Sequence, residues 1–321
     1  MQIVDLDNAG MESAANALID GQLVAVPTET VYGLAADATN DSAVAKIFAA
    51  KGRPQFNPLI AHVNGLDMAR QFGKFDDISL KLVAAFWPGP LTLVVPAVAN
   101  SKASVLVSAG LPTIGLRHPK GIMAKLAGKL DRPLAAPSAN SSGKISPTSA
   151  QHVADDLGKN IAIIMDGGPC VLGLESTIVK IEQGAVFILR PGGISAMQLE
   201  DCLGFQLSKQ APLAKPESPG QLLTHYAPNI PLRLNVTELR NGEALLRFGE
   251  HDINGANPVT EKNLSPDGNL EDAARNLFAH LHELDKSQAS GIAVQSIPHE
   301  GIGVAINDRL KRAAHGSQND D

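Results

Sequence analysis

Hydroxyl and carboxylate side chains follow directly on an apolar segment near the N-terminus. This segment, residues 23–26, is typical of a buried strand, and the Thr-Glu-Thr sequence at 28–30 falls where such a strand ends. Lys51 and Arg53 come later in the chain. Because α/β proteins place their chemistry at strand ends, hydroxyls and cations in this pattern are suited to binding a polyanion. The pattern therefore predicts a polyanion site.

The two cations also have a purely structural explanation. Residues 42–50 are Ala-rich with apolar residues at helical spacing, so both cations stand at the C-terminal end of a predicted helix, with Gly52 as its stop. The helix dipole favours positive side chains there. Pro54 and Pro58 argue for the functional alternative, because they stiffen the following backbone and hold the cations beside the threonine-rich turn.

Further polar residues accompany later apolar segments. Thr113 and Arg117 have even spacing, so both side chains point to one face of a strand. The alternative is the exposed face of an edge strand. The loop 137–143 offers small hydroxyl and amide groups to phosphate oxygens, although an ordinary Ser/Gly turn has the same composition. Ser146 precedes a predicted helix, either as part of an anion site or as a plain N-cap.

Several familiar catalytic motifs are missing. Gly168 and Gly173 have the spacing of a phosphate-binding Walker loop, but Leu174 stands where its lysine belongs. The sequence has no dinucleotide-binding glycine motif after a strand, no His-Glu-x-x-His sequence and no Gly-x-Ser-x-Gly turn. Arginines, a lysine, hydroxyls and asparagine without a covalent nucleophile suit the positioning and charge stabilisation of a phosphate leaving group.

Length and composition describe an ordinary globular protein. With 321 residues, 44% hydrophobic and 19% charged, two domains are expected rather than one. The formal charge of −6 argues against a general nucleic-acid coat. Two cysteines exclude a disulfide framework and a cysteine-based zinc site. No segment is apolar enough to span a bilayer and a signal sequence is absent, so a cytoplasmic protein without membrane contact is expected.

Helix and strand patterns alternate along the chain, which is typical of an α/β protein. Helices are predicted over residues 11–20, 42–50, 76–86, 148–157, from 194, 271–286 and 303–314. Strands are predicted over residues 22–26, 59–63, 91–95, 113–117, 133–136, 161–165, 176–181, 185–190, 231–235, 244–248 and 292–295. Proline punctuation without periodicity indicates a linker at 206–230, between a larger domain, 1–205, and a smaller α/β domain, 231–321.

Taken together, the motifs resemble the YrdC-type threonylcarbamoyl-AMP synthases. In the first domain the matching segments are 27–34 (PTETVYGL), 51–54 (KGRP), 57–60 (NPLI), 86–92 (FWPGPLT), 137–140 (PSAN) and 175–177 (EST). Four further segments of this chain resemble the linker and C-terminal domain of the two-domain long form. They are 218–220 (SPG), 225–228 (HYAP), 263–266 (NLSP) and 301–310 (GIGVAINDRL). The resemblance covers nearly the whole chain.

The resemblance implies a fold and an activity. The fold is an open, twisted α/β sheet around a concave basic cavity. The activity is the joining of L-threonine, bicarbonate and ATP into threonylcarbamoyl-adenylate with release of pyrophosphate, with Mg²⁺ bridging the ATP phosphates and no protein ligand to the metal. A separate threonylcarbamoyl-transfer complex then modifies the adenosine next to the anticodon of tRNA. Direct contact of this chain with tRNA is left open.

The resemblance also implies roles for individual residues. Those implied to hold threonine are Thr30, His62, Arg117, the Ala136 backbone and Ser176. Those implied to hold ATP are Lys51, Arg53, Asn57, Thr113, Ser138, Asn140, Ser146, Arg190 and, as a lid, Tyr226. Lys51 and Arg53 are also implied to be catalytic, and replacing either by alanine is expected to leave folding intact and abolish adenylate formation. A satisfied core histidine is the alternative for His62.

Two other functions fit parts of the sequence. A concave basic surface could hold structured RNA without chemistry, although the acidic charge and an aromatic content of 4% weaken this alternative. Carbamoyl-transferring hydrogenase-maturation enzymes contain a related domain, but their zinc modules need more cysteines than this chain has. One departure from the family pattern lies at 221–224, where Gln-Leu-Leu-Thr replaces a basic residue and an aromatic.

Overall fold

The computed structural model of the protein describes residues 1–208, 218–220 and 224–317. These residues group into two units. The first holds Met1–Ser142, Pro147–Cys170 and Glu175–Gln221, and the second holds Gly143–Ser146, Val171–Leu174 and Leu222–Asp321. The predicted linker, 206–230, is therefore described only in part, and most of the departure at 221–224 lies outside the described residues.

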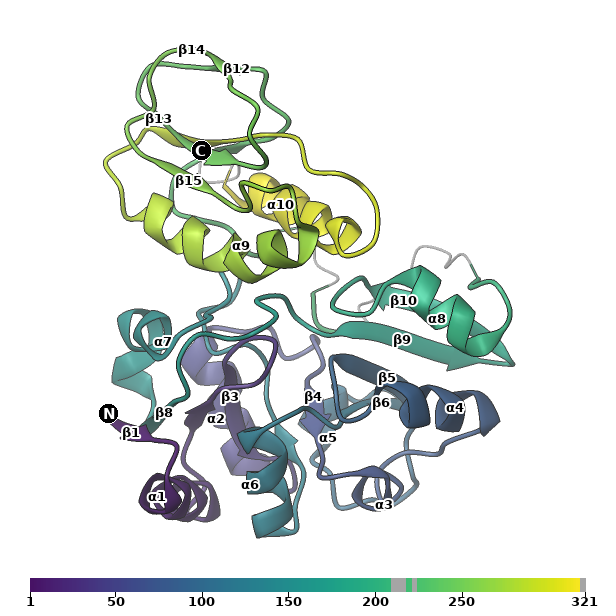
Figure 1. The fold of residues 1–321 in the computed structure, drawn as a ribbon. Coiled ribbons are helices and arrows are strands. Elements are labelled where there is room, and N and C mark those ends of the chain that lie inside the picture. The colour runs from purple at the N-terminus through teal and green to yellow at the C-terminus, as the bar shows by residue number, and fades with distance from the viewer. Residues whose placement is uncertain (209–217, 221–223, 318–321) are drawn as a thin grey trace. The chain divides into compact units, whose positions relative to one another are not determined.

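The first unit is built on a ten-stranded sheet that mixes parallel and antiparallel pairs (Figure 1). The strands, in spatial order, are β1 (Gln2–Asp5), β8 (Ile163–Asp166), β2 (Val24–Val26), β3 (Gly33–Asp37), β7 (Leu134–Ala135), β4 (Ile60–His62), β6 (Thr113–Arg117), β5 (Leu91–Pro96), β9 (Thr177–Glu182) and β10 (Ala185–Arg190). Since β2, β3, β7 and β4 pair antiparallel in turn, β4 and its parallel neighbour β6 run opposite to β2. The strands that carry polar motifs thus do not share one carboxyl edge.

Helices pack on this sheet and bury their apolar sides in one core of Ala, Val, Leu and Ile residues. They are α1 (Asn8–Ile19), α2 (Asp41–Lys51), α3 (Leu66–Ala69), α4 (Asp77–Phe86), α5 (Val105–Ser108), α6 (Ile122–Leu130), α7 (Ala150–Leu157), the 3-10 helix η1 (Gly158–Asn160) and α8 (Ala196–Leu203). Helix α1 packs against α6, and α4 packs against α8, as Figure 1 shows. No helix among the described residues is both long and apolar enough to cross a membrane.

Helix α2 determines where the cation Lys51 lies. Asn40 caps the N-terminus by accepting a hydrogen bond from the amide of Ala43 at 3.1 Å. Gly52 ends the helix in the left-handed conformation, with φ of 59°. Lys51 is therefore the last helical residue, and its side chain is buried. The helix predicted for this stretch, with Gly52 as its stop, is confirmed.

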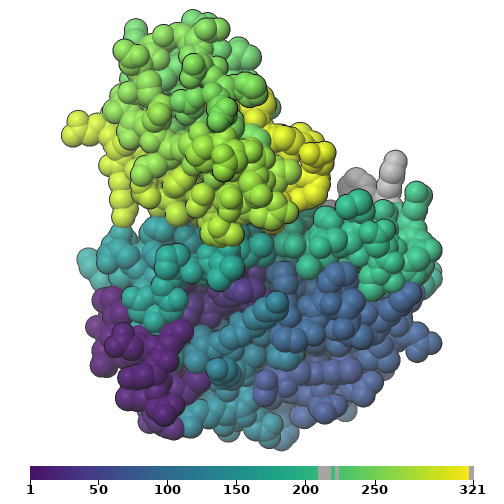
Figure 2. Space-filling model, in the orientation of Figure 1, coloured from purple at the N-terminus to yellow at the C-terminus, as the bar shows by residue number. Residues whose placement is uncertain are grey.

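The edge strand β1 lies at the surface of the first unit. Met1, Ile3 and Leu6 are exposed by 60%, 46% and 43%, so this edge of the sheet contributes little to the core. The N-terminal residues, purple in Figure 2, are visible there on the surface. Several buried polar residues, among them Thr30, His62 and Arg117, belong instead to strands and turns inside the sheet.

The second unit is a smaller α/β structure. Its main sheet is parallel, in the order β11 (Leu232–Arg233), β16 (Gly291–Val294), β13 (Glu243–Arg247) and β15 (Glu261–Asn263). Helices α9 (Leu270–Asp285) and α10 (Gly303–Gly316) pack against each other. A short pair, β12 (Glu238–Leu239) and β14 (Asn254–Gly255), completes it. The predicted α/β class with a smaller C-terminal α/β unit is confirmed.

Candidate active site

Arg117 stands at the centre of a buried polar group in the first unit. Its Nη1 donates a hydrogen bond to Thr30 Oγ1 at 3.1 Å, and its Nε donates to the carbonyl oxygen of Gly89 at 3.2 Å. Its Nη2 lies 2.9 Å from Glu29 Oε2, which makes an ion pair. Arg117 is only 4% exposed. We refer to Thr28, Glu29, Thr30, His62 and Arg117 as the Arg117 cluster.

The Thr28–Thr30 turn presents its hydroxyls to Arg117 through a directed chain of hydrogen bonds. Thr28 Oγ1 donates to the carbonyl oxygen of Val31 at 2.7 Å. Its contact with Thr30 Oγ1, also 2.7 Å, must therefore use the proton of Thr30. The oxygen of Thr30 is then left to accept from Arg117. A short polar turn after β2 thus fixes both the place and the direction of one partner of the guanidinium.

His62 ends β4 and is the register neighbour of Arg117 on β6. It is 3% exposed, and its Nδ1 has no hydrogen-bond partner within the described part of the chain. Burial, and then the charge of Arg117, lower the pKa of His62 from 6.5 to about 3. The lowered pKa favours the neutral imidazole, and the alternative of a core histidine stays open. The edge-strand alternative for Arg117 is wrong, because β6 lies between β4 and β5.

Lys51 and Arg53 belong to a second buried group. Lys51 Nζ donates to the carbonyl oxygens of Ser138, at 2.7 Å, and of Asn140. Burial, and then the charge of Arg53, lower the pKa of Lys51 well below its usual value. Arg53 Nε and Nη2 donate to the carbonyl oxygens of Asn57 and Pro58 at 3.2 and 2.8 Å. We refer to Lys51, Arg53, Asn57, Ser138 and Asn140 as the Lys51 cluster.

Arg190 and Ser176 form a third contact. Arg190 Nε and Nη2 donate to the carbonyl oxygen of Ser176 at 3.2 and 2.9 Å, and Nη2 lies 3.2 Å from Ser176 Oγ. Arg190 Nη1 donates to the carbonyl oxygen of Pro219 at 3.4 Å. Ser176 Oγ also lies 2.8 Å from Thr92 Oγ1, and both hydroxyls are buried. A residue predicted to hold ATP and one predicted to hold threonine thus share hydrogen bonds.

The remaining predicted residues take different positions. Ala136 is buried, and its amide donates to the carbonyl oxygen of Ile60 at 3.0 Å, whereas Thr113, at the start of β6, is half-buried. Ser146 and Tyr226 belong to the second unit. There the Tyr226 ring stacks on Phe278 with centroids 5.5 Å apart. The roles predicted for Ser146 and Tyr226 stay predictions.

Two side chains with long-range contacts were given no role by sequence reasoning. Glu29 lies inside the Thr-Glu-Thr motif, and Thr92 lies inside the Pro-Gly-Pro-Leu-Thr motif. Each makes its contact with a residue far away in the chain, since Thr92 and Ser176 are 84 residues apart. Nothing in the local pattern indicates such a partner, although the motifs themselves marked both segments.

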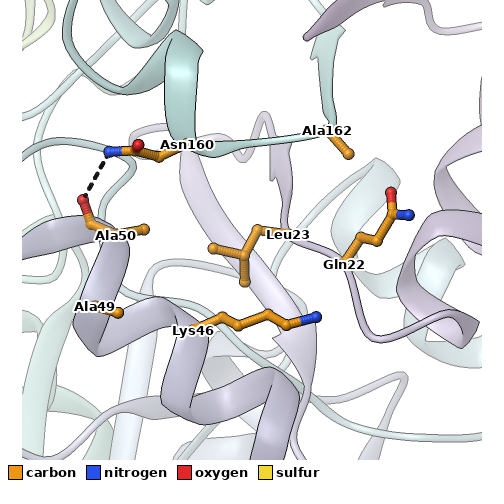
Figure 3. Close-up of a pocket in the computed structure, with 7 residues that line it drawn as sticks. All are labelled: Gln22, Leu23, Lys46, Ala49, Ala50, Asn160 and Ala162. Carbon is orange, nitrogen blue, oxygen red and sulfur yellow. Dashed lines mark hydrogen bonds between the residues drawn. The ribbon is translucent and has the colours of Figure 1, made fainter.

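Two cavities of the first unit are lined by other residues. One, of about 430 Å³, is lined by Gln22, Leu23, Lys46, Ala49, Ala50, Asn160 and Ala162 (Figure 3). Lys46 Nζ there donates to the carbonyl oxygen of Gly21 at 2.6 Å, and Asn160 Nδ2 donates to that of Ala50 at 3.4 Å. The other, of about 760 Å³, lies beside the Asp37–Arg132 ion pair. Neither of these two cavities is lined by a predicted site residue, so the clusters are the better candidate.

Comparison with known proteins gives matches over nearly the whole chain. Residues 16–192 match the family model described as "Telomere recombination", and residues 194–315 match the one described as "Threonylcarbamoyl-AMP synthase, C-terminal domain". A threonylcarbamoyl-AMP synthase of Bacillus subtilis is 39% identical, covering 94% of this chain and 92% of its own length. One from Pyrococcus abyssi is 36% identical, covering 94% of this chain and 93% of its own length.

A solved structure agrees with these relatives. The crystal structure of Pyrococcus abyssi Sua5 complexed with L-threonine matches with a TM-score of 0.89 and 32% identity, over 99% of this chain and 98% of that chain. The resemblance predicted from the motifs is confirmed. This chain belongs to the two-domain threonylcarbamoyl-AMP synthase family.

Proposed function

We propose that this protein joins L-threonine, bicarbonate and ATP into threonylcarbamoyl-AMP and releases pyrophosphate. Family membership over nearly the full length, with both domains present, is the observation that carries the proposal. The proposal includes a cytoplasmic location and use of the product by a separate complex that transfers the threonylcarbamoyl group to tRNA. Two free cysteines are in keeping with a reducing compartment.

The Arg117 cluster is the proposed threonine site. A guanidinium can bind a carboxylate through two parallel hydrogen bonds, so Arg117 is assigned the α-carboxylate of threonine. Thr30, Ser176, His62 and the Ala136 backbone are assigned the other polar groups of the amino acid. The unpartnered Nδ1 of the buried His62 supports this assignment, because buried polar atoms are normally hydrogen-bonded.

The Lys51 cluster, with Arg190, is the proposed ATP site. Asn57, Thr113 and Ser138 are assigned to it with the three cations and Asn140. Asn57 supports the assignment, since it is 1% exposed and its Oδ1 has no hydrogen-bond partner among the residues that the structure covers. Lys51 Nζ uses two of its three donors on carbonyl oxygens, and a phosphate oxygen can take the third.

The proposed chemistry is an in-line displacement at phosphorus. Threonine's ammonium group first loses a proton to solvent, and the resulting amine and bicarbonate give a carbamate and water. A carbamate oxygen then forms a bond to the α-phosphorus of ATP while the bond from that phosphorus to the β-bridging oxygen breaks, and pyrophosphate leaves with the electron pair. Both reactants are anions, so Lys51, Arg53 and Arg190 reduce their repulsion.

Mg²⁺ is proposed to arrive with ATP, because phosphate oxygens are the ligands that this hard cation prefers. Its chemistry is to neutralise charge on the phosphates. Among the residues described, no group of three or more His, Cys, Asp and Glu side chains is placed to hold a metal ion. The proposal assigns no protein residue as a metal ligand, because the ATP phosphates are expected to hold the ion.

The test is a measurement of pyrophosphate release from ATP and Mg²⁺. Threonine, serine and no amino acid are compared, each with and without bicarbonate. We expect release to need threonine and bicarbonate together. Pyrophosphate release that depends on neither threonine nor bicarbonate would refute the proposal. An absence of release, combined with RNA binding that weakens steeply as the salt concentration rises, would also refute it.

A further inference from the structure

The Arg117–Glu29 ion pair has hydrogen-bonding positions that the protein itself does not use. Arg117 Nη2 and Glu29 Oε2 are 2.9 Å apart, at side-chain exposures of 4% and 13%. Both carboxylate oxygens of Glu29 are shielded from solvent, and in the described part of the chain neither makes a hydrogen bond of good geometry. The same holds for Arg117 Nη2. One positive and one negative group are thus buried side by side with hydrogen-bonding positions to spare.

Such an arrangement is unfavourable when it serves structure alone. Removing a carboxylate and a guanidinium from water costs free energy, which mutual attraction offsets only when further hydrogen bonds satisfy the remaining positions. Lone pairs in the protein interior are normally satisfied by hydrogen bonds, as those of Thr28 and Thr30 are in the same turn. The unsatisfied oxygens of Glu29 therefore indicate a ligand that carries hydrogen-bond donors.

An α-amino acid has the charge pattern that this pair would complement. Its carboxylate and its ammonium group are attached to the same carbon, so a ligand site needs a cation and an anion side by side. Arg117 and Glu29 supply them from β6 and from the turn after β2. Glu29 is the acidic member of the Arg117 cluster. His62 carries no negative charge in either protonation state, so it cannot replace Glu29 as an anionic partner for an ammonium group.

We propose that Glu29 binds the α-ammonium group of the amino-acid substrate, so that Arg117 and Glu29 together form a site for a zwitterion. This inference rests on the proposed function, because it uses Arg117 as the ligand of the α-carboxylate. It adds a selectivity that the carboxylate contact alone does not give. The site accepts zwitterionic amino acids and rejects acids of the same size that lack the amine.

The first test is a kinetic comparison of wild type with Glu29→Gln, which keeps the size of the side chain and removes its charge. Charge-assisted hydrogen bonds are strong, so we expect the KM for threonine to rise about tenfold to a hundredfold in pyrophosphate release. The KM for ATP should stay within about twofold. The matched control is Glu12→Gln, because Glu12 forms an exposed ion pair with Lys129 at 2.6 Å; it should change neither value.

The second test separates ammonium binding from a supporting role for Arg117. The probe is 3-hydroxybutanoate, which keeps the carboxylate and hydroxyl of threonine and lacks the amine. We expect 3-hydroxybutanoate, as a competitor of threonine, to inhibit the Glu29→Gln variant at least as strongly as it inhibits wild type. The same variant should bind threonine more weakly than wild type does. A parallel loss for probe and threonine would overturn the proposal, since it would mean that Glu29 only holds Arg117 in place.

The two proposals can fail separately. If wild type releases no pyrophosphate in response to threonine and bicarbonate, the proposed function fails. If wild type does respond and Glu29→Gln keeps the wild-type KM for threonine, only the role of Glu29 fails. Binding of threonine measured by calorimetry gives the same comparison without turnover, and thermal unfolding of each variant checks that it is folded.

Discussion

The Lys51 cluster and the Arg117 cluster bury charge in the same unit in opposite ways. The cations of the Lys51 cluster donate to main-chain carbonyl oxygens, those of Ser138, Asn140, Asn57 and Pro58. Arg117 mainly meets side chains, the Thr30 hydroxyl and the Glu29 carboxylate, and takes one carbonyl oxygen, that of Gly89. The first cluster ties loops together, and the second collects groups that can turn toward a ligand.

Because of this difference, substitutions in the two clusters are expected to affect stability and activity to different extents. A main-chain carbonyl cannot find a new partner without movement of its loop, so loss of a cation that binds it leaves a buried acceptor unsatisfied. A hydroxyl or carboxylate can rotate. We therefore expect substitutions in the Lys51 cluster to cost folding free energy as well as activity, and substitutions in the Arg117 cluster to act mainly on substrate binding.

The largest effect is expected for Lys51→Met, which keeps the buried stem and removes the ammonium group. One buried and one partly buried carbonyl oxygen lose their donor, so the free energy of unfolding should fall by about 2 to 4 kcal/mol, after allowance for the desolvation of the charge that is also removed. Urea unfolding measures it. The sequence alone led to the expectation of intact folding, and the structure argues against it because Lys51 is 4% exposed.

Lys129→Met is the matched control for this change. Lys129 pairs with Glu12 on the surface, where ion pairs contribute little, so its replacement should alter unfolding by less than about 0.5 kcal/mol. Equal urea midpoints for Lys51→Met and Lys129→Met would contradict the proposed difference between the Lys51 cluster and the Arg117 cluster. The Lys51 cluster would then be a ligand site and not a tie between loops.

A smaller effect is expected from pH, through His62. Its pKa is about 3 in the folded protein against 6.5 for an ordinary histidine, so the unfolded chain binds a proton at pH values where the folded protein does not. The contribution to stability is therefore fully present above the unfolded pKa and is lost as pH falls from about 6.5 toward 3. Between about pH 7.5 and pH 5 the loss is about 2 kcal/mol.

His62→Gln isolates this contribution. Both proteins are unfolded with urea at about pH 7.5 and about pH 5, and the fall in unfolding free energy is compared. We expect the variant to fall by about 2 kcal/mol less than wild type, because it lacks the titrating imidazole. Identical pH dependence in the two proteins would show that His62 is hydrated or hydrogen-bonded in solution, and the Arg117 cluster would lose one of its unsatisfied groups.

The sequence predicted much of this fold because its main signals are local. The strand at 113–117 was predicted with the bounds that β6 has, and the helix before Gly52 ends at Lys51. Strand β3 was missed because Gly-Leu-Ala-Ala-Asp has little strand preference of its own and depends on pairing with β2 and β7. Helix α6 was missed although its apolar spacing is regular, since Gly121 provides no side-chain cap to mark its start.

The site was predictable as a set of residues and not as a set of contacts. Motif resemblance named Thr30 and Arg117, but the hydrogen bond between them joins residues 87 positions apart. Because β2 and β6 run in opposite directions, their carboxyl ends do not meet at one edge of the sheet. The usual rule for parallel strands therefore does not predict that Thr30 and Arg117 lie together. Such pairs follow from the strand order of the mixed sheet, which a single sequence does not specify.

The smallest effect is expected at Thr92, and it sharpens the comparison most directly. Its Oγ1 lies 2.8 Å from Ser176 Oγ, with both residues buried. Thr92→Val removes one hydroxyl at nearly constant volume, and Ser176 keeps its contact with Arg190 at 3.2 Å. We therefore expect a loss of only about 1 kcal/mol in unfolding free energy.

Activity should respond more than stability does. Without Thr92 Oγ1, the Ser176 hydroxyl can rotate away from the amino acid, so the KM for threonine should rise about threefold to tenfold, as expected for one neutral hydrogen bond. Thr92→Ser, which keeps the hydroxyl, should restore the wild-type KM, and this separates positioning of Ser176 from packing of the methyl group. A Thr92→Val enzyme that loses stability but keeps its KM would place Thr92 with the residues that tie the fold together, and the division between the two kinds of buried polar group would no longer hold along β5.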